Sequence, residues 1–497
     1  MDRLELLKNL SFGSQVAEDE IASLGSYFVK TDQWNRILKG DIDIVRGEKG
    51  AGKSALYLLL NQNHAELRTR GVLTLNGENP RGATVFKDLV ADPPAAENEF
   101  VVLWKLYILT LICHRLRSEQ IAPAKLAKIF GQLEEAGLME SELNLASLLR
   151  SAQKFARRLL TIESYESGIQ VDPATLLPTG LTGKITLSEP TASARELGAQ
   201  SVDGMFQAVE NVLVSEGLSI WVLLDRLDVA FAESHELEAN ALRALIKVYG
   251  DLRALDHIDL KVFIREDIWK RITDSGLREA SHITKFTVLD WNSASLLNLV
   301  LRRLLNNDSL VNAFNINADE ILADTSKQEA LFARFYPEKV EQGPKTPTTF
   351  NWMVGRRADS TGKTAPRELI QLLNSVKDEE IRRLEKGGHP PAPDQLFDRS
   401  VFKLALPIVS DTRLRTYLYA EYPKHKPFLE QLEGQRTEQT PESLAEIWSV
   451  TRPEAIQEAI KLVELGFFEA RGTKHEPTFW VPFLYRDALR LVQGKAE

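Results

Sequence analysis

Residues 47–54 read Gly47-Glu-Lys-Gly-Ala-Gly-Lys53-Ser54, and this stretch decides the fold. The glycines let the backbone turn with its N–H groups pointing inward, and no bulky side chain blocks a triphosphate. Lys53 is placed to reach the β and γ phosphates, and Ser54 to bind Mg²⁺. The stretch therefore predicts a phosphate-binding loop. The residues expected to contact the nucleotide are Gly47, Glu48, Lys49, Gly50, Ala51, Gly52, Lys53 and Ser54.

The flanks of the loop have the context that such a motif requires. Residues 41–46 alternate and are β-branched, which is typical of a strand. The apolar run from Ser54 to Leu60 predicts a helix, whose positive N-terminus adds to phosphate binding. Strand, glycine loop and helix in this order favour a nucleotide site over an empty glycine-rich turn.

An acid that follows an apolar strand supplies the second part of the site. Residues 219–224 are a largely apolar run, typical of a buried parallel strand, and Asp225 follows directly. Open α/β sheets bind ligands at the carboxyl ends of their strands, so Asp225 is placed to hold Mg²⁺ through water. The alternative is that Asp225 caps the N-terminus of a helix.

The position after Asp225 departs from a hydrolytic site. Many hydrolytic P-loop proteins have a glutamate there to align water, whereas this chain has Arg226. Asp228 is the next candidate to orient the attacking water. Arg226 is either a surface arginine or the partner of Asp228. The sequence therefore predicts ATP binding more firmly than rapid ATP hydrolysis.

Two arginines are candidates to reach the phosphates. Arg265 ends the strand predicted over 260–264, where it can stabilise charge on a transferring phosphoryl group, or form an ion pair with Asp267 or Asp225. Arg367 follows Pro366 in the first turn of a predicted helix, where a cation opposes the helix dipole. Either Arg367 reaches bound nucleotide, or it is a solvated arginine.

The composition is that of an ordinary globular protein with a net charge of −9, from 61 basic and 70 acidic residues. This balance disfavours general nucleic-acid binding. The single cysteine, Cys113, excludes an intrachain disulfide and fits a reducing compartment. No signal-peptide pattern and no apolar run long enough to span a bilayer is present, so we expect a cytoplasmic protein without membrane contact.

Elsewhere the pattern is mixed. The other predicted elements are strands over 71–75 and 99–103, helices within 122–163 and over 236–249, a long inserted loop or hairpin over 166–200, a mostly helical region from about 275, and a domain boundary at 387–393.

These residues resemble the AAA+ and STAND branch of P-loop ATPases over roughly residues 12–375. Residues 47–54 match the Walker A motif and 223–228 match Walker B, while Asp225 and Asp228 resemble the paired acids of STAND proteins. Arg265 falls at the sensor-one position, Arg367 resembles the sensor-two arginine, and the stretch from Val288 through Arg303 resembles the start of the helical lid. The resemblance implies ATP and Mg²⁺ as cofactors; no guanine-specific Asn-Lys-x-Asp motif is present. It also implies an α/β P-loop domain over 1–275, a helical lid over 276–390, and a third domain over 391–497.

The last hundred residues resemble a winged helix. Residues 441–448 and 453–466 predict two helices, and 467–473 and 478–482 predict two wing strands. The second helix has Glu454, Glu458 and Glu464 against Lys461 alone, and residues 401–497 contain 13 basic and 14 acidic residues. A DNA reader needs cations for the phosphates. We therefore favour a protein-facing or autoinhibitory module, with DNA binding as the alternative.

A narrower resemblance is to a poorly characterised set of bacterial P-loop ATPases. It rests on Phe12-Gly13 with Ala17-Glu18, on residues 27–31, and on residues 221–228. Some members lie near phage-defence genes, which suggests a role in antiviral defence or stress.

Three functions stay open from the sequence. The first is an ATP-dependent switch or motor acting on an unknown protein partner. AAA+ relatives usually form homo-oligomers in which an arginine completes the neighbouring site, and Arg243, Arg253 and Arg302 are candidates here. The second is a DNA-acting initiator or loader. The third is a nucleotide-binding scaffold with little turnover.

Overall fold

A computed structural model of the chain shows two compact units. One unit comprises Thr31–Glu48 and Lys53–Leu289, and the other comprises Met1–Lys30, Lys49–Gly52 and Asp290–Glu497. Residues 1–30 and four loop residues therefore group with the C-terminal part, a different division from the one expected at 275 and 390. The structure describes residues 2–79, 84–87, 89, 96–166, 185–190, 192, 196, 198–227, 234–274, 276–357, 364–473 and 476–496.

A five-stranded sheet forms the centre of the first unit. Its order is β2-β5-β6-β1-β7, and each neighbouring pair is parallel. Strand β5 is almost wholly buried, which explains why it is a near-continuous apolar run, whereas Phe286 of the edge strand β7 is exposed. The prediction over 219–224 is confirmed. The bounds are β1 Ile44–Gly47, β2 Val72–Asn76, β5 Ser219–Leu224, β6 Ile258–Arg265 and β7 Phe286–Leu289.

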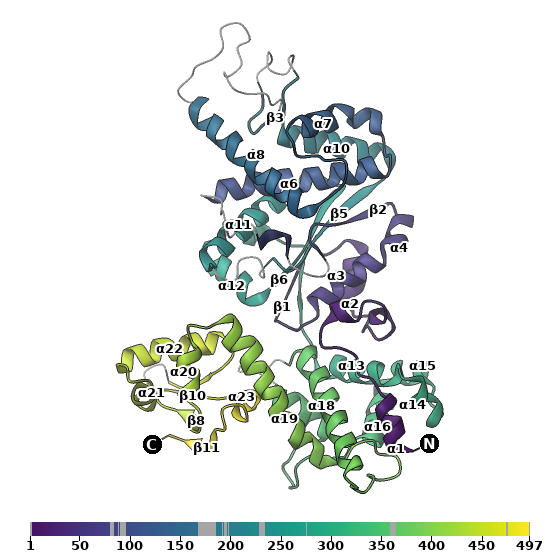
Figure 1. Cartoon of the computed structure of the whole chain (residues 1–497), viewed down its shortest axis with the longest axis vertical. Helices are drawn as coiled ribbons and strands as arrows, with labels where there is room; N and C mark the ends of the chain where they lie inside the picture. The colour runs from purple at the N-terminus through teal and green to yellow at the C-terminus, as the bar shows by residue number, and fades with distance from the viewer. Residues whose placement is uncertain are drawn as a thin grey trace. The chain divides into compact units, whose positions relative to one another are not determined.

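Helices lie on both sides of this sheet (Figure 1). Helix α3 packs on β1, β2 and β6, and helix α6 packs on β2 and β5. The bounds are α2 Asp32–Lys39, α3 Lys53–Gln62, α4 His64–Thr69, η3 Val85–Lys87, α6 Glu97–Ser118, α7 Pro123–Glu135, α8 Leu145–Glu166, α10 Val202–Glu216, α11 His235–Leu252, α12 Glu266–Asp274 and η5 Arg278–His282.

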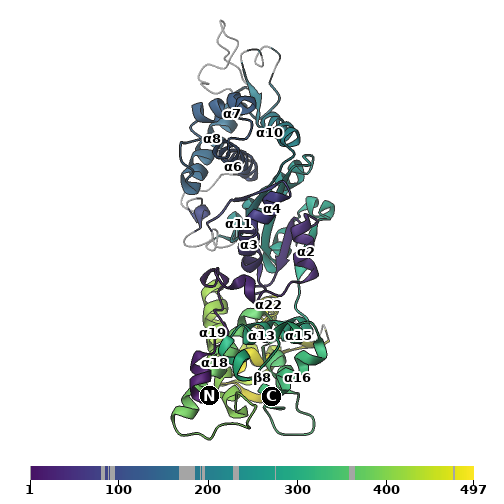
Figure 2. The ribbon, with the colours of Figure 1, turned by 90° about the vertical axis from the view of Figure 1, so that its right-hand side faces the viewer.

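Helix α6 corrects one sequence prediction. The strand expected over 99–103 lies inside this 22-residue helix. A short apolar run does not distinguish a buried strand from a buried helix. Here acids in the first turn and arginines in the last turn suit the helix dipole. The helix is apolar on nearly every side because α8, α10 and α11 pack around it (Figure 2).

The predicted insertion over 166–200 lies mostly outside the described residues. Its described parts include the short strands β3 Ile185–Thr186 and β4 Gln200–Ser201, which pair in parallel.

The second unit contains a helical lid with its own apolar core. Leu6, Leu7 and Phe12 of the N-terminal segment join this core. The bounds are α1 Arg3–Asn9, η1 Ala17–Asp19, η2 Leu24–Ser26, α13 Ser293–Leu305, α14 Asp308–Ala313, α15 Ala318–Leu322, α16 Thr325–Phe335, α17 Thr349–Arg357, α18 Pro366–Glu385 and α19 Arg399–Arg413.

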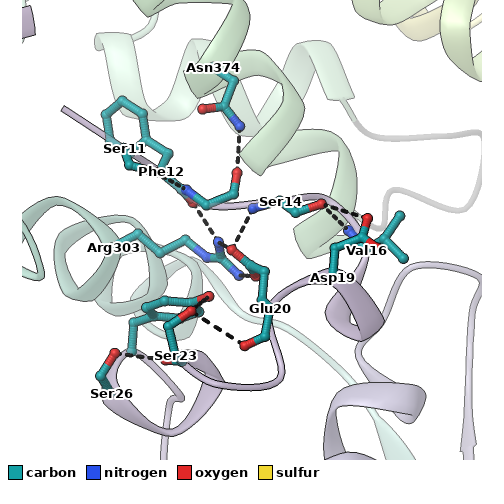
Figure 3. A network of polar contacts seen from close by, with 12 residues as sticks. Ser11, Phe12, Ser14, Val16, Asp19, Glu20, Ser23, Ser26, Arg303 and Asn374 are labelled. Carbon is teal, nitrogen blue, oxygen red and sulfur yellow. Dashed lines mark hydrogen bonds and ion pairs between the residues drawn. The ribbon is translucent and has the colours of Figure 1, made fainter. Parts of the chain in front are cut away.

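A buried ion pair fixes the N-terminal segment to the lid (Figure 3). Arg303 of α13 donates from Nη2 to Oε2 of Glu20 at 3.0 Å, and its guanidinium lies 4.4 Å from the ring of Tyr27. Asn374 of α18 donates to the carbonyl of Gly13 at 2.8 Å. Gly13 has φ +76°, and a Cβ there would lie 1.8 Å from Oε1 of Glu20. Only glycine therefore fits at this crossing.

The C-terminal domain is winged-helix-like. Two helices pack together beside a four-stranded sheet of order β11-β8-β10-β9, and its apolar core is separate from that of the lid. Both predicted helices and both wing strands are present, whereas β8 and β11 were not expected. The bounds are η6 Leu414–Tyr419 (a π-helix), α20 Lys426–Glu430, β8 Arg436–Gln439, α21 Pro441–Trp448, α22 Arg452–Glu464, β9 Glu469–Gly472, β10 Pro477–Trp480, α23 Phe483–Arg486 and β11 Val492–Lys495.

The fold class expected from the sequence is thus confirmed: a parallel sheet flanked by helices, a helical lid and a winged-helix-like domain. Within the described residues, the helices are all too short or too polar to cross a bilayer.

Candidate functional site

The phosphate-binding loop joins β1 to α3. β1 ends at Gly47 and α3 begins at Lys53. Gly50 has φ +84° and Gly52 has φ +102°, both in the left-handed region that L side chains rarely adopt. Glycine is therefore required at two of the three motif positions, as the sequence predicts for a loop whose N–H groups face a phosphate.

Lys53 lies against its own loop. Its Nζ donates to the carbonyl of Gly47 at 2.9 Å and to that of Glu48 at 3.0 Å. The ammonium group is thereby held at the start of the loop, at the N-terminal end of α3. A cation and a helix N-terminus together attract negatively charged ligands.

The acid predicted at the sheet edge is present and buried. Asp225 directly follows β5 and is 3% exposed. Burial raises the pKa of Tyr57, and the Asp225 charge raises it further. Tyr57 lies on α3 one turn beyond Lys53. The charge of Asp225 therefore acts on a residue of the helix that begins with the loop lysine.

The magnesium site predicted from the sequence stays a prediction. The described residues contain no group of three or more His, Cys, Asp and Glu that would hold a metal. Mg²⁺ often takes one or two protein ligands and completes its shell with water and substrate phosphate. Ser54 and Asp225 are the side chains that would hold it.

Glu78 is a buried carboxylate that the sequence reasoning missed. It lies two residues beyond β2, whose last residue Asn76 pairs with Leu223, so Glu78 and Asp225 follow the ends of two neighbouring strands. Its oxygens accept from the Asn79 N–H at 2.8 Å and the Thr84 hydroxyl at 2.7 Å. Burial raises its pKa, whereas the Arg226 charge lowers it. An acid just past a second apolar strand was the signal available in the sequence.

The segment after Asp225 is partly described. Arg226 has φ +58°, an uncommon backbone conformation for a residue with a side chain. Asp228, the predicted water-orienting residue, lies outside the described residues. Its assignment stays a prediction.

Arg265 forms the ion pair with Asp267, one of the arrangements that the sequence predicts for it. It ends β6 and pairs in register with Gly47 of the loop. Its guanidinium donates to both carboxylate oxygens of Asp267, at 3.0 and 2.8 Å. The ion pair with Asp267 holds this sensor-one candidate at the level where the loop begins.

Loop residues 49–52 belong to the same unit as the helical lid, and there they contact the start of α18. A Cβ on Gly50 would lie 2.9 Å from Cβ of Arg367 and 3.4 Å from that of Ala365. Nε of Arg367 is buried and has no hydrogen-bond partner among the described residues. This packing brings the sensor-two candidate to the phosphate loop.

Trp291 is a second residue that sequence reasoning did not single out. Its indole Nε1 donates to the carbonyl of Ala51 at 2.9 Å. The ring also packs on an apolar cluster of Val29, Leu299 and Ile370. The cluster gives the loop a buried apolar neighbour.

The packing at Gly50 yields a prediction. Gly50→Ala is expected to weaken ATP binding about tenfold or more. A left-handed residue costs about 1–2 kcal/mol, and the 2.9 Å contact adds to this. Titration of a fluorescent ATP analogue measures the change. Gly355→Ala, in α17 with nothing within 4 Å of the added Cβ, is the control. Equal affinity in both variants would contradict the close packing.

The three arginines proposed to act on a neighbouring subunit all have partners within the chain. Arg243 donates to Asn240 at 2.7 Å, Arg253 to the carbonyl of His282 at 2.6 Å, and Arg302 to Asn298 at 2.7 Å. None is yet distinguished as a trans-acting residue, so this assignment stays a prediction.

Comparisons with known proteins find similarity only among solved structures. No family model matches the chain, and no curated protein matches it. The Aeropyrum pernix ORC2 protein in ADPNP–ADP complexes is 12% identical, with a TM-score of 0.37, covering 91% of this chain and 89% of that chain. Its ADP form is 12% identical, with a TM-score of 0.31, covering 95% and 90%. The Aeropyrum pernix ORC1 protein in complex with DNA is 13% identical, with a TM-score of 0.28, covering 74% and 91%. At these values the similarity indicates no function.

Proposed function

We propose that the chain is an ATP-binding and ATP-hydrolysing switch or motor of the AAA+ and STAND type. The observation that carries the proposal is the packing of loop residue Gly50 against Arg367 of the lid helix α18. A nucleotide held by the loop would meet both the loop and the start of α18. Binding can then bias the position of the lid, because a ligand shifts the conformation with which it interacts better.

The proposed site has a role for each residue. Lys53 would bind the β and γ phosphates, with the backbone N–H groups of residues 47–52 around them. Ser54 and Asp225 would hold Mg²⁺, which neutralises charge on the phosphates. Arg265 and Arg367 would stabilise charge on the transferring phosphoryl group. Asp228 would orient water, with Glu78 as a second carboxylate at the same sheet edge.

The C-terminal domain supports a protein-facing role over a DNA-binding one. Arg471 of the wing strand β9, Arg486 of α23 and Arg356 of α17 form a row of arginines stacked on Trp480 and Phe483. Two of the three form hydrogen-bonded ion pairs with carboxylates: Arg356 with Glu341 at 2.7 Å, and Arg471 with Glu469 at 2.8 Å. Such pairing leaves fewer cations for phosphates.

The partner and pathway belong to the proposal as well. We propose a homo-oligomer acting on a protein partner in bacterial stress or antiviral defence. Two other functions compete with this one: initiator-like action on DNA, and a scaffold with little turnover. One experiment distinguishes all three.

That experiment is steady-state ATP hydrolysis by the purified chain, with and without double-stranded DNA. Turnover is expected without DNA, and Asp228→Asn is expected to lower kcat by about 10²–10⁴, because a general base contributes that much. Asp41→Asn, an exposed acid before β1, is the matched control. DNA stimulation that weakens with salt would support the loader instead. Tight ATP binding without turnover in any condition would leave the scaffold.

A further inference from the structure

Lys49 of the phosphate loop is held by an acid of the C-terminal domain. Its Nζ forms an ion pair with Oε1 of Glu421 and lies 5.3 Å from the ring centre of Tyr417. The two charged side chains are 25% and 24% exposed. A pair exposed to this degree can separate without leaving a charge stranded in a dry core. A carboxylate thus contacts the loop that would bind phosphates.

An irregular helix brings Glu421 to the loop. α19 continues past Arg413 into the π-helix Leu414–Tyr419 and two further helical residues, the second of which is Glu421. A π-helical segment inside a helix is rare and is found often at functional sites. Among the residues that the structure describes, this is the one π-helix. The π-helix ends two residues before Glu421, so the irregular segment leads directly to the residue that contacts Lys49.

The same helix also contacts the lid beside Arg367. Arg413 lies 4.0 Å from the ring centre of Tyr417 and pairs with Glu368 at 2.7 Å. Glu368 is the residue after Arg367 in α18. The ring of Tyr417 therefore contacts both Lys49 and Arg413. Movement of Glu421 would therefore change the contacts at the start of α18.

Charge decides what Glu421 does to a bound nucleotide. Its carboxylate neutralises Lys49 and adds a negative charge near the phosphates. A γ phosphate brings further negative charge, so Glu421 repels a triphosphate more than a diphosphate. The contact disfavours ATP relative to ADP for as long as Glu421 stays on Lys49.

We infer that Glu421 sets the preference of the loop between ADP and ATP. ATP binding requires Glu421 to leave Lys49, and its departure releases the π-helical end of α19 together with the C-terminal domain. ADP is compatible with the contact. This inference rests on the proposed nucleotide site and names the residue through which the C-terminal domain regulates it.

The test is the ratio of dissociation constants for ADP and a nonhydrolysable ATP analogue, measured by calorimetry with Mg²⁺ on the full chain. Glu421→Gln is expected to shift the ratio about tenfold toward the triphosphate, within the range of about 5- to 150-fold usual for coupled sites. Glu421→Lys is expected to shift it further. Asp411→Asn removes an acid of the same helix, which pairs with Arg415 at 2.7 Å, and should leave the ratio unchanged.

Each result decides the question. The expected order supports the inference, and a smaller Glu421→Gln effect at high salt adds to that support because salt screens partly exposed charges. An unchanged ratio in both folded Glu421 variants overturns it, as does an equal shift in Asp411→Asn. Nucleotide binding that survives Lys53→Ala overturns the proposed site instead, and with it the inference.

Discussion

Lys53→Ala is expected to lower ATP affinity by about 2–5 kcal/mol, roughly 30-fold to several-thousand-fold, the usual cost of removing one partner of a hydrogen-bonded charge pair. The fold should survive. Lys53 is not part of the core, and its Nζ contacts the carbonyls of Gly47 and Glu48 at the loop itself. Without the ammonium group, the β and γ phosphates would face the loop N–H groups alone.

Calorimetric titration with ATP and Mg²⁺ measures the loss. Lys39→Ala is the matched control, because Lys39 is an exposed lysine in the last turn of α2 in the same unit. Circular dichroism and the melting temperature show whether both variants fold. Unchanged ATP affinity in a folded Lys53→Ala protein would contradict the assignment of residues 47–54 as a nucleotide site.

The sheet and the loop were predictable because each has a strong local signal. A parallel strand covered on both faces is an apolar run, as β5 is, and its end is marked by the first acid. The loop requires glycine at two left-handed positions, so its sequence is constrained by backbone geometry. Both the strand and the loop could be predicted from neighbouring residues alone.

The parts of the site that the sequence analysis missed depend on residues far apart in the chain. Glu78 stands out only because β2 pairs with β5, so that two acids follow the ends of neighbouring strands. Trp291 reaches Ala51 across 240 positions. Arg265 pairs with Asp267, as one of its two interpretations expected, and its role toward a phosphate stays a prediction. Patterns of hydropathy carry no information on such pairings.

The N-terminal segment is the clearest case of a tertiary arrangement hidden from the sequence. The resemblance to AAA+ and STAND ATPases puts residues 1–30 in the P-loop domain over 1–275. They belong instead to the unit of the lid, where Glu20 and Arg303 meet as charges that are both 6% exposed. Pairing between positions 283 residues apart leaves no periodic pattern.

Glu20→Gln is expected to destabilise the second unit by about 3–5 kcal/mol, because it leaves the buried Arg303 guanidinium without its counter-ion. The carboxylate receives N–H groups from Arg303 and from the backbone of Ser14, so a neutral amide would also turn a donor toward donors. The N-terminal segment should detach from the lid first. Urea unfolding followed by tryptophan fluorescence measures the midpoint of the first transition, since the chain need not unfold in one step.

Glu385→Gln is the control for this prediction. Glu385 pairs with Lys8 at 2.7 Å, so it also joins the N-terminal segment to α18, but both side chains are about half exposed, at 47% and 51%. Exposed pairs contribute about 0–1 kcal/mol. Replacing Arg303 and Glu20 together by Met and Leu should restore much of the loss, because removing both charges avoids a buried charge without a partner. If the single and double variants lose stability equally, the pair acts through packing rather than charge.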